Sequence, residues 1–250
     1  MKYLSYLLLT AVLLLTSCED KKNASEVKTE TTAESKTTSE KKSTSTKDTT
    51  TLDTSENEEK EETIGAGYPK ITQENLSEFL TKYGKENPET KVKIATRLGD
   101  IVIDLYEDTP LHRANFIYLV KQGYFNETFF HRIVPNFIIQ GGNSDLPSTN
   151  EKRFKLGDDY LIPAEINGRN HFKGSVSGAK EYRENPDKKS APFEFFIFLG
   201  PQTSTGHLNG NYTVFGRVTQ GMNVVEKIAA LPSDEGDWPL QNVYIEAEVL

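Results

Sequence analysis

FFHRIVPNFIIQGG, residues 129–142, places one charged side chain, Arg132, inside an otherwise apolar run. Aromatic and β-branched residues dominate the run, which favours a strand over a helix. Arginine is seldom buried without a partner, so Arg132 either lies on the solvated face of a half-exposed strand or serves a site. Strict alternation predicts two faces, one with Phe130, Arg132 and Val134 and the other with Phe129, His131 and Ile133.

Pro135 interrupts this strand, because proline cannot donate a hydrogen bond to a neighbouring strand. We expect a turn or bulge at Pro135–Asn136, followed by a second strand over residues 137–140 that ends at Gly141–Gly142. The stretch is therefore predicted to contribute two consecutive strands.

The rest of the C-terminal part alternates mostly between strand and turn patterns. We predict a hairpin over 91–106 turning at Leu98–Asp100, a helix over 110–122, strands over 172–179, 193–199, 213–218 and 243–249, and a helix over 221–230. Residues 143–170 are predicted to be loop-rich, with a short extended piece near 160–165, and residues 180–192 to form turns. Many strands, two helices and no βαβ rhythm favour a mainly β, closed antiparallel barrel.

Three further blocks extend the pattern of residues 129–142: KGSVSGA at 173–179, FEFFIF at 193–198 and HLNGNYTVFGRV at 207–218. Together the four blocks resemble, in order and nearly in spacing, the cyclophilin family of peptidyl-prolyl cis–trans isomerases. The resemblance covers about residues 91–250. It implies an eight-stranded antiparallel β-barrel capped by two α-helices, isomerase activity (EC 5.2.1.8), and neither cofactor nor metal.

Residues 67–90 form a helical extension ahead of that domain. The apolar side chains of the predicted helix over 71–84 share one face, with Thr72 as N-cap and Gly84 as C-cap. The apolar face either docks on the domain or binds a partner, and we favour docking. Its members are Leu76, Phe79, Leu80 and Tyr83.

Residues 1–18 have the pattern of an export signal, with Lys2 at the start and an apolar core over 7–15 that is too short to span a bilayer. The sequence LTSC at 15–18 resembles a bacterial lipobox, which implies cleavage before Cys18 and lipidation of that residue. The alternative is an ordinary secretory signal with a chance cysteine. A lipid anchor at Cys18 would place the protein in the bacterial cell envelope.

Residues 19–66 are rich in Thr, Ser, Lys and Glu and contain no aromatic residue. Such a segment buries too little apolar surface to offset its chain entropy, so we expect a disordered tether. With an r.m.s. reach of about 40 Å, the tether would hold the domain away from a membrane.

Composition excludes several classes of function. A net charge of −8 without a basic cluster argues against nucleic-acid binding. A single cysteine excludes an intramolecular disulfide and a cysteine-based metal site, and the four histidines lack metal-binding spacing. No nucleophile elbow, phosphate loop or dinucleotide fingerprint is present.

Prolyl isomerisation needs none of these motifs. Rotation about the amide has a barrier of about 18–20 kcal/mol, because resonance is lost midway. A cationic donor directed at the proline nitrogen stabilises the twisted state more than either planar state. Arginine suits this task, because it stays charged and carries several N–H donors on a rigid fork.

The resemblance assigns roles to individual residues. It implies that Arg132 is catalytic, and that Gln140 binds the substrate backbone and braces the arginine. For the apolar members of the pocket, ordinary core packing is the alternative reading. The implied substrate-binding residues are Phe137, Ile138, Ala179, Lys180, Glu194, Phe196, His207, Leu208 and Tyr212.

Several positions depart from the family pattern. Ile138 replaces a common Met, Tyr212 a common His, and His207 a Trp. Glu194 replaces a common Gln and adds negative charge near Arg132, which would weaken the donor. Lys180 replaces a common Asn, which would favour acidic residues before the proline.

The sequence thus predicts an isomerase that acts on proline-containing segments of unfolded or exported proteins. The alternative is a catalytically weak chaperone or adaptor that binds proline-containing peptides at the membrane. Retention of Arg132, Phe137 and Gln140 favours the enzyme. A monomer is expected.

Overall fold

The computed structural model describes residues 67–157, 160–180 and 185–250. The predicted signal sequence, Cys18 and the tether over 19–66 lie outside the described residues. Within the described ranges, no helix is long and apolar enough to span a bilayer.

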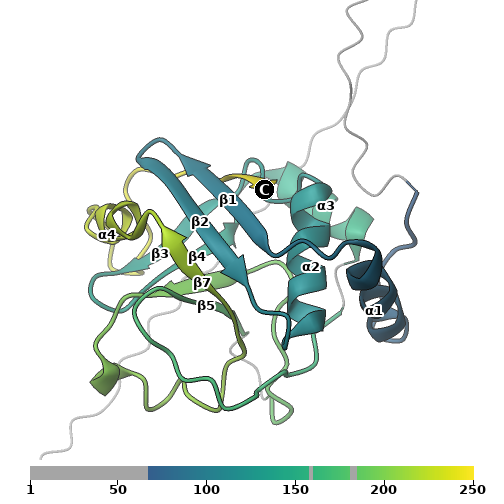
Figure 1. Ribbon diagram of the computed structural model, residues 1–250. Helices are drawn as coiled ribbons and strands as arrows, with labels where there is room; N and C mark the ends of the chain where they lie inside the picture. Colours follow the sequence, from purple (N-terminus) through teal and green to yellow (C-terminus); the bar gives the residue numbers. More distant parts are fainter. Residues whose placement is uncertain (1–66, 158–159, 181–184) are drawn as a thin grey trace, which may run out of the picture. The chain divides into compact units, whose positions relative to one another are not determined.

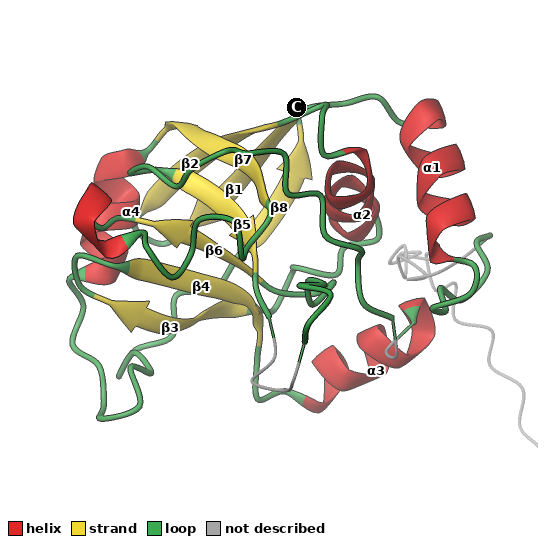
Figure 2. Ribbon diagram, turned by 90° about the horizontal axis from the view of Figure 1, so that it is seen from below, coloured by secondary structure: helices red, strands yellow, loops and turns green. Residues whose placement is uncertain are grey.

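The predicted eight-stranded, mainly β architecture is confirmed. All the strand pairs are antiparallel, and the strands form one sheet in the order β3-β4-β6-β5-β7-β2-β1-β8. The sheet is curled (Figure 1), and Figure 2 labels all of its strands. The strands are β1 (Lys91–Thr96), β2 (Gly99–Leu105), β3 (Phe129–Val134), β4 (Ile138–Asn143), β5 (Ser175–Gly178), β6 (Phe195–Phe198), β7 (Val214–Gln220) and β8 (Glu246–Val249).

The two ends of the sheet are joined by the residues just before β8. Phe129 at the start of β3 forms an isolated antiparallel bridge with Tyr244. The Phe130 amide donates to the Val243 carbonyl at 3.1 Å, and the Ile245 amide donates to the Thr128 carbonyl at 2.8 Å. Main-chain groups that a free edge would expose are therefore paired here.

The two predicted capping helices lie at opposite ends of the sheet (Figure 2). They are α2 (Pro110–Lys121) and α4 (Met222–Ala229). Pro110 stands in the first turn of α2, where its missing N–H costs nothing. In α4, Val224, Val225, Ile228 and Ala229 are buried, which agrees with the predicted inward face.

One α-helix was not predicted, nor was the short 3-10 helix η1 (Gln202–Ser204). α3 (Pro147–Leu156) lies in the stretch expected to be loop-rich. Its sequence has no apolar periodicity, and only Thr149 and Leu156 are buried. Smaller corrections concern strand ends: β4 continues through both glycines to Asn143, and the β1–β2 turn is Arg97–Leu98, one residue earlier than expected. β5 and β8 each start three residues later than predicted.

The N-terminal extension carries a helix that docks on the domain, as favoured above. α1 (Leu76–Glu86) starts later than predicted, because Thr72 caps a preceding turn by accepting from the Asn75 amide at 3.4 Å. The predicted C-cap Gly84 was wrong, since the helix continues past it and Asn87 is the C-cap. Arg113 of α2 secures the other end by donating to the Gly84 carbonyl at 3.0 Å. The buried face comprises Leu76, Leu80, Tyr83 and Gly84, all but the glycine within the main core.

The inner face of the sheet is lined by a row of aliphatic side chains. Ile133 of β3 faces Ile139 of β4, which faces Ile197 of β6, which in turn faces Val176 of β5. All four side chains are fully buried in the main core. Because successive residues point to opposite faces, their chain neighbours lie on the outer face.

Candidate functional site

Three residues share a row on the outer face of the sheet. Arg132 of β3 is paired with Gln140 of β4, and Gln140 is paired with Phe196 of β6. Side chains of directly paired residues point to the same side and lie close together. Strand register therefore brings together an arginine, an amide and an aromatic ring that lie far apart in the sequence.

A β-bulge corrects the predicted faces of β3. Phe130 is paired with Gly141 and Arg132 with the next residue, Gln140, so His131 is the extra residue on β3. The bulge puts Phe130 in the main core together with Ile133, instead of beside Arg132 and Val134. The predicted alternation was wrong before the bulge and right after it.

An apolar cluster separate from the main core lies next to Arg132, and we call it the pocket cluster. It contains the four predicted pocket residues, and the predicted residue Tyr212 packs against it. Two further members, Val134 and Phe198, were not predicted to belong to the pocket. Its buried members are Ile138, Phe196, Phe198 and Leu208, and its partly buried members are Val134, Phe137 and Tyr212.

Three predicted residues form the rim of the pocket cluster. The His207 ring lies 5.5 Å from that of Phe137, and the Tyr212 ring lies 5.5 Å from that of Phe196. The Lys180 ammonium lies 4.3 Å from the centre of the Tyr212 ring. The rim is therefore aromatic on one side and positively charged beside Tyr212.

The partner of Arg132 is an aspartate that the sequence argument missed. Arg132 Nε donates to Asp237 Oδ2 at 3.2 Å, and Arg132 Nη2 lies 3.2 Å from the same oxygen. The Asp237 carbonyl also accepts from the Ile133 amide at 2.8 Å, which fixes its loop to β3. Gln140, expected to brace the arginine, makes no hydrogen bond to Arg132 among the described residues, and Asp237 takes that role.

Gln140 belongs to a different network. Its Nε2 donates to Glu194 Oε2 at 2.9 Å, and Arg153 Nη2 of α3 lies 3.3 Å from Glu194 Oε1. Arg153 Nε also donates to the Tyr124 hydroxyl at 2.9 Å. The negative charge of Glu194, expected near Arg132, is instead neutralised by a cation from the unpredicted helix.

The electrostatic surroundings of Glu194 hold it ionised. Burial alone would raise its pKa, but His131, whose Nε2 lies 3.5 Å from Oε2, and then Arg153 and Gln140 bring the pKa below the usual 4.5. Glu194 acts here as an acceptor for Gln140.

Ala179 has its backbone engaged within the protein. Its amide donates to the Glu194 carbonyl at 3.1 Å, and its carbonyl accepts from the Ala191 amide at 2.8 Å. The structure places Ala179 beside Glu194 and next to Lys180, as the motif order implied. Its amide is not available to a substrate in this arrangement, which leaves the following residue, Lys180, as the nearer candidate for backbone contacts.

Replacing Glu194 by glutamine is expected to reduce the free energy of unfolding by roughly 1–2 kcal/mol at pH 7, because charged hydrogen bonds become neutral ones. The folded-state pKa lies below 4.5, so the carboxylate stabilises the fold above that pH and loses its effect as the pH falls through the folded pKa. The deficit of Glu194→Gln should therefore shrink in acid.

Urea denaturation of parent and variant at pH 7 and pH 3.5 measures this difference. Glu151→Gln serves as the control, because Glu151 is an exposed residue of α3. A Glu194→Gln deficit that is equal at both pH values would show that the lost stability does not come from the ionised form of the carboxylate.

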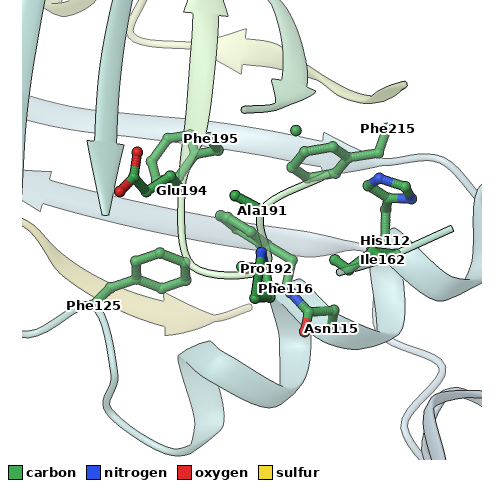
Figure 3. A pocket seen from close by; sticks show the side chains of 11 residues that line it. His112, Asn115, Phe116, Phe125, Ile162, Ala191, Pro192, Glu194, Phe195 and Phe215 are labelled. Atoms are coloured by element: carbon green, nitrogen blue, oxygen red, sulfur yellow. Dashed lines mark hydrogen bonds between the residues drawn. The ribbon is translucent and has the colours of Figure 1, made fainter. Parts of the chain in front are cut away.

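A small cavity lies on the inner side, apart from the pocket cluster (Figure 3). Its volume of about 10 Å³ approaches that of one water and excludes a proline ring. His112 lines it, with Nε2 2.9 Å from Ser190 Oγ and Nδ1 2.6 Å from Glu165 Oε2. Ser190 is 1% exposed, and Glu165 accepts from the first amides of α2. This chain of hydrogen bonds therefore connects the segments that carry Glu165 and Ser190 to α2.

The comparison with protein families supports the isomerase reading of the fold. The family described as cyclophilin type peptidyl-prolyl cis-trans isomerase/CLD matches residues 91–249. That range contains every predicted site residue except Cys18 and excludes α1.

Curated relatives carry the same enzyme name. A peptidyl-prolyl cis-trans isomerase of Acinetobacter baylyi is 37% identical over 147 residues, which are 58% of this chain and 74% of that protein. One of Schizosaccharomyces pombe is 35% identical over 157 residues, 62% of this chain and 94% of that protein. The chain spans only about a third of a longer relative, peptidyl-prolyl cis-trans isomerase-like 2 of Rhizopus delemar, at 32% identity.

The solved structures agree in fold. A crystal structure of a cyclophilin type peptidyl-prolyl cis-trans isomerase from Cryptosporidium parvum aligns with a TM-score of 0.54 at 27% identity. The alignment covers 65% of this chain and 98% of that chain.

Proposed function

The chain belongs to the cyclophilin-type peptidyl-prolyl cis-trans isomerases, and on this premise we propose that Arg132 stabilises the twisted Xaa–Pro bond while the pocket cluster holds the proline ring. The observation that carries this proposal is the row of Arg132, Gln140 and Phe196 on the outer face of the sheet. It puts the only charged side chain of β3, apart from the bulged His131, beside a separate apolar cluster on the face opposite the core. A residue needed only for packing would not require a cation there.

The chemistry follows from what rotation does to the amide. When the bond twists, conjugation is lost and the proline nitrogen gains a localised lone pair. The Arg132 guanidinium would donate to that lone pair, an interaction that exists only in the twisted state and therefore lowers the barrier. No proton is transferred and no covalent bond forms.

Asp237 supports this role by orienting the guanidinium. The contacts from Nε and Nη2 to one carboxylate oxygen fix the plane of the fork, while Nη1 has no partner among the described residues. Arg132 retains roughly a third of its side-chain exposure, so it is reachable by a substrate. The donor is thus preorganised before the substrate arrives.

Gln140 has a separate task in this proposal. Glu194 accepts from Gln140 Nε2 and so fixes which end of the amide faces outward. The amide oxygen, Gln140 Oε1, is then directed to accept from a backbone N–H of the substrate. Because Arg153 balances the charge of Glu194, the carboxylate leaves Arg132 its full donor strength.

Isomerisation of peptide substrates tests the mechanism directly. Exchange between the cis and trans forms of a short Xaa–Pro peptide is measured by NMR, with the parent and with an Arg132 variant. Acceleration by the parent that depends on Arg132 supports the proposal, and the expected size of the effect is argued in the Discussion.

The cellular setting is a second part of the proposal. We infer that the enzyme acts on exported proteins in the cell envelope, attached to a membrane through lipid on Cys18, because LTSC follows a short apolar segment at the N-terminus. Uncatalysed isomerisation takes tens to hundreds of seconds and limits folding, which gives an exported isomerase its purpose. Several acyl chains at one cysteine would anchor the protein firmly.

Replacing Cys18 by serine is expected to abolish lipid attachment, because the thiol that carries the lipid is removed and no other cysteine exists in the chain. In bacteria that express the full chain and are fed an alkyne fatty acid, the parent should be labelled and fractionate with membranes. The Cys18→Ser variant should lose the label. Equal labelling of both would contradict lipidation at Cys18.

A further inference from the structure

Two lysine side chains meet at one edge of the pocket cluster. The Lys180 ammonium lies over the Tyr212 ring, 4.3 Å from its centre. The Lys188 ammonium donates to the Gly210 carbonyl at 2.7 Å. Both ammonium groups therefore contact the same short segment, residues 210–212, which ends in the rim residue Tyr212.

The position of Lys188 is built by a hydrogen-bonded turn. The Asn185 carbonyl accepts from the Lys188 amide at 3.1 Å, and the Asn185 side chain both accepts from and donates to the backbone of Lys189. Lys188 itself has a φ of +56°, an uncommon conformation for a residue with a side chain. The turn thus adopts an unfavourable backbone conformation at Lys188, and it places the ammonium of that residue at this edge of the pocket cluster.

Within residues 67–157, 160–180 and 185–250, no salt bridge compensates the charge of Lys180 or Lys188. Burial and then repulsion from Lys188 lower the pKa of Lys180. Among the described residues, neither ammonium has a carboxylate within salt-bridge distance. Neighbouring lysines differ, since Lys189 lies 3.4 Å from Asp187 and Lys173 lies 2.5 Å from Glu226.

We propose that Lys180 and Lys188 form a subsite for a carboxylate of the substrate, so that the enzyme prefers Xaa–Pro segments with Asp or Glu adjacent to the proline. This inference rests on the proposed function, because it places the proline ring in the pocket cluster next to Tyr212. A carboxylate there meets two cations at once and relieves their mutual repulsion. Partial burial of Lys180 keeps the attraction from being fully screened.

Matched peptides test the subsite with the full chain, purified in mild detergent. One pair carries Glu or Gln immediately before the proline, and a second pair carries Glu or Gln immediately after it. We expect kcat/KM to favour Glu over Gln roughly three- to tenfold in at least one pair, the range that one or two partly exposed ion pairs provide. Raising the salt concentration should reduce this ratio.

Lys188→Met and Lys180→Met should each lower the Glu/Gln ratio toward one. Lys173→Met removes the same charge at a lysine already paired with Glu226 on α4 and should keep the ratio of the parent. A parent ratio near one in both pairs would overturn the subsite, as would a ratio that survives in both lysine variants or ignores salt. Turnover of the Gln peptides reports the proposed function separately, because it requires no carboxylate on the peptide. If a variant does not fold, the salt dependence of the Glu/Gln ratio in the parent still tests the subsite.

Discussion

Replacing Arg132 by alanine is expected to slow enzyme-catalysed cis–trans exchange of an Xaa–Pro peptide by roughly 10²–10³-fold, the cost of removing one preorganised donor from a site that stabilises developing charge. The physical reason is that the guanidinium interacts with the proline nitrogen only in the twisted state. Binding of the planar peptide depends on the pocket cluster, which the substitution leaves in place. The loss should therefore appear mainly in kcat.

The fold should survive this substitution. The side chains of Arg132 and Asp237 are 34% and 38% exposed, so removal of one leaves the other in contact with water and not buried as an unpaired charge. The circular dichroism spectrum and unfolding midpoint of Arg132→Ala should stay close to those of the parent.

Arg132→Lys is the matched variant, because it keeps the charge and loses the planar fork that Asp237 holds. We expect its activity to lie between those of the parent and the alanine variant. An Arg132→Ala enzyme within about threefold of the parent would contradict the catalytic assignment. A parent that binds the peptide without accelerating exchange would instead favour the alternative function, a chaperone or adaptor that binds proline-containing peptides at the membrane.

Replacing Gly142 by alanine is expected to destabilise the fold by roughly 3–5 kcal/mol, a large fraction of the stability of a single domain. Gly142 has a φ of +99°, a region that residues with a side chain rarely adopt, and a Cβ would lie 2.1 Å from the Phe193 carbonyl oxygen. Because that atom belongs to the backbone, a strand would have to move. The Gly142 carbonyl also accepts from the buried Tyr124 hydroxyl at 2.7 Å, so the shift would disturb the partners of Arg153.

Gly168→Ala separates the two causes of the lost stability, which are the positive φ and the close approach of a Cβ to the Phe193 carbonyl. Gly168 has a comparable φ of +82°, but nothing lies within 4 Å of a Cβ there. It should lose only the conformational part, about 1–2 kcal/mol. Urea denaturation of both variants measures the difference, and equal losses would show that close approach to Phe193 has no energetic weight.

Local patterns in the sequence predicted most of the fold. The β1–β2 hairpin, α2 and α4 follow from alternation, proline placement and apolar spacing, all of which act within a few residues. The apolar face of α1 also predicted that this helix docks on the domain. α3 escaped the same reasoning, because its ten residues bury only two side chains and give no periodic signal.

The members of the pocket cluster were predicted better than the contacts of the polar residues beside it. Resemblance and apolar pattern named five of the seven residues of the pocket cluster, and the structure brings these five together. The partners of the polar residues differ from expectation: Asp237 contacts Arg132 across 105 positions of sequence, and Arg153 contacts Glu194 across 41. Signals for such pairs do not exist in a single sequence, because neither residue has a local pattern that depends on the other.

By itself, the sequence determined most of the elements, the family and the side chains available for chemistry, because alternation, turns and motifs depend on neighbours along the chain. Only the tertiary structure decided which of them meet. The bulge at His131, and pairing between β3, β4 and β6, put Arg132, Gln140 and Phe196 in one row on the outer face. Register is a property of two strands together, and a shift by one residue would exchange core and site.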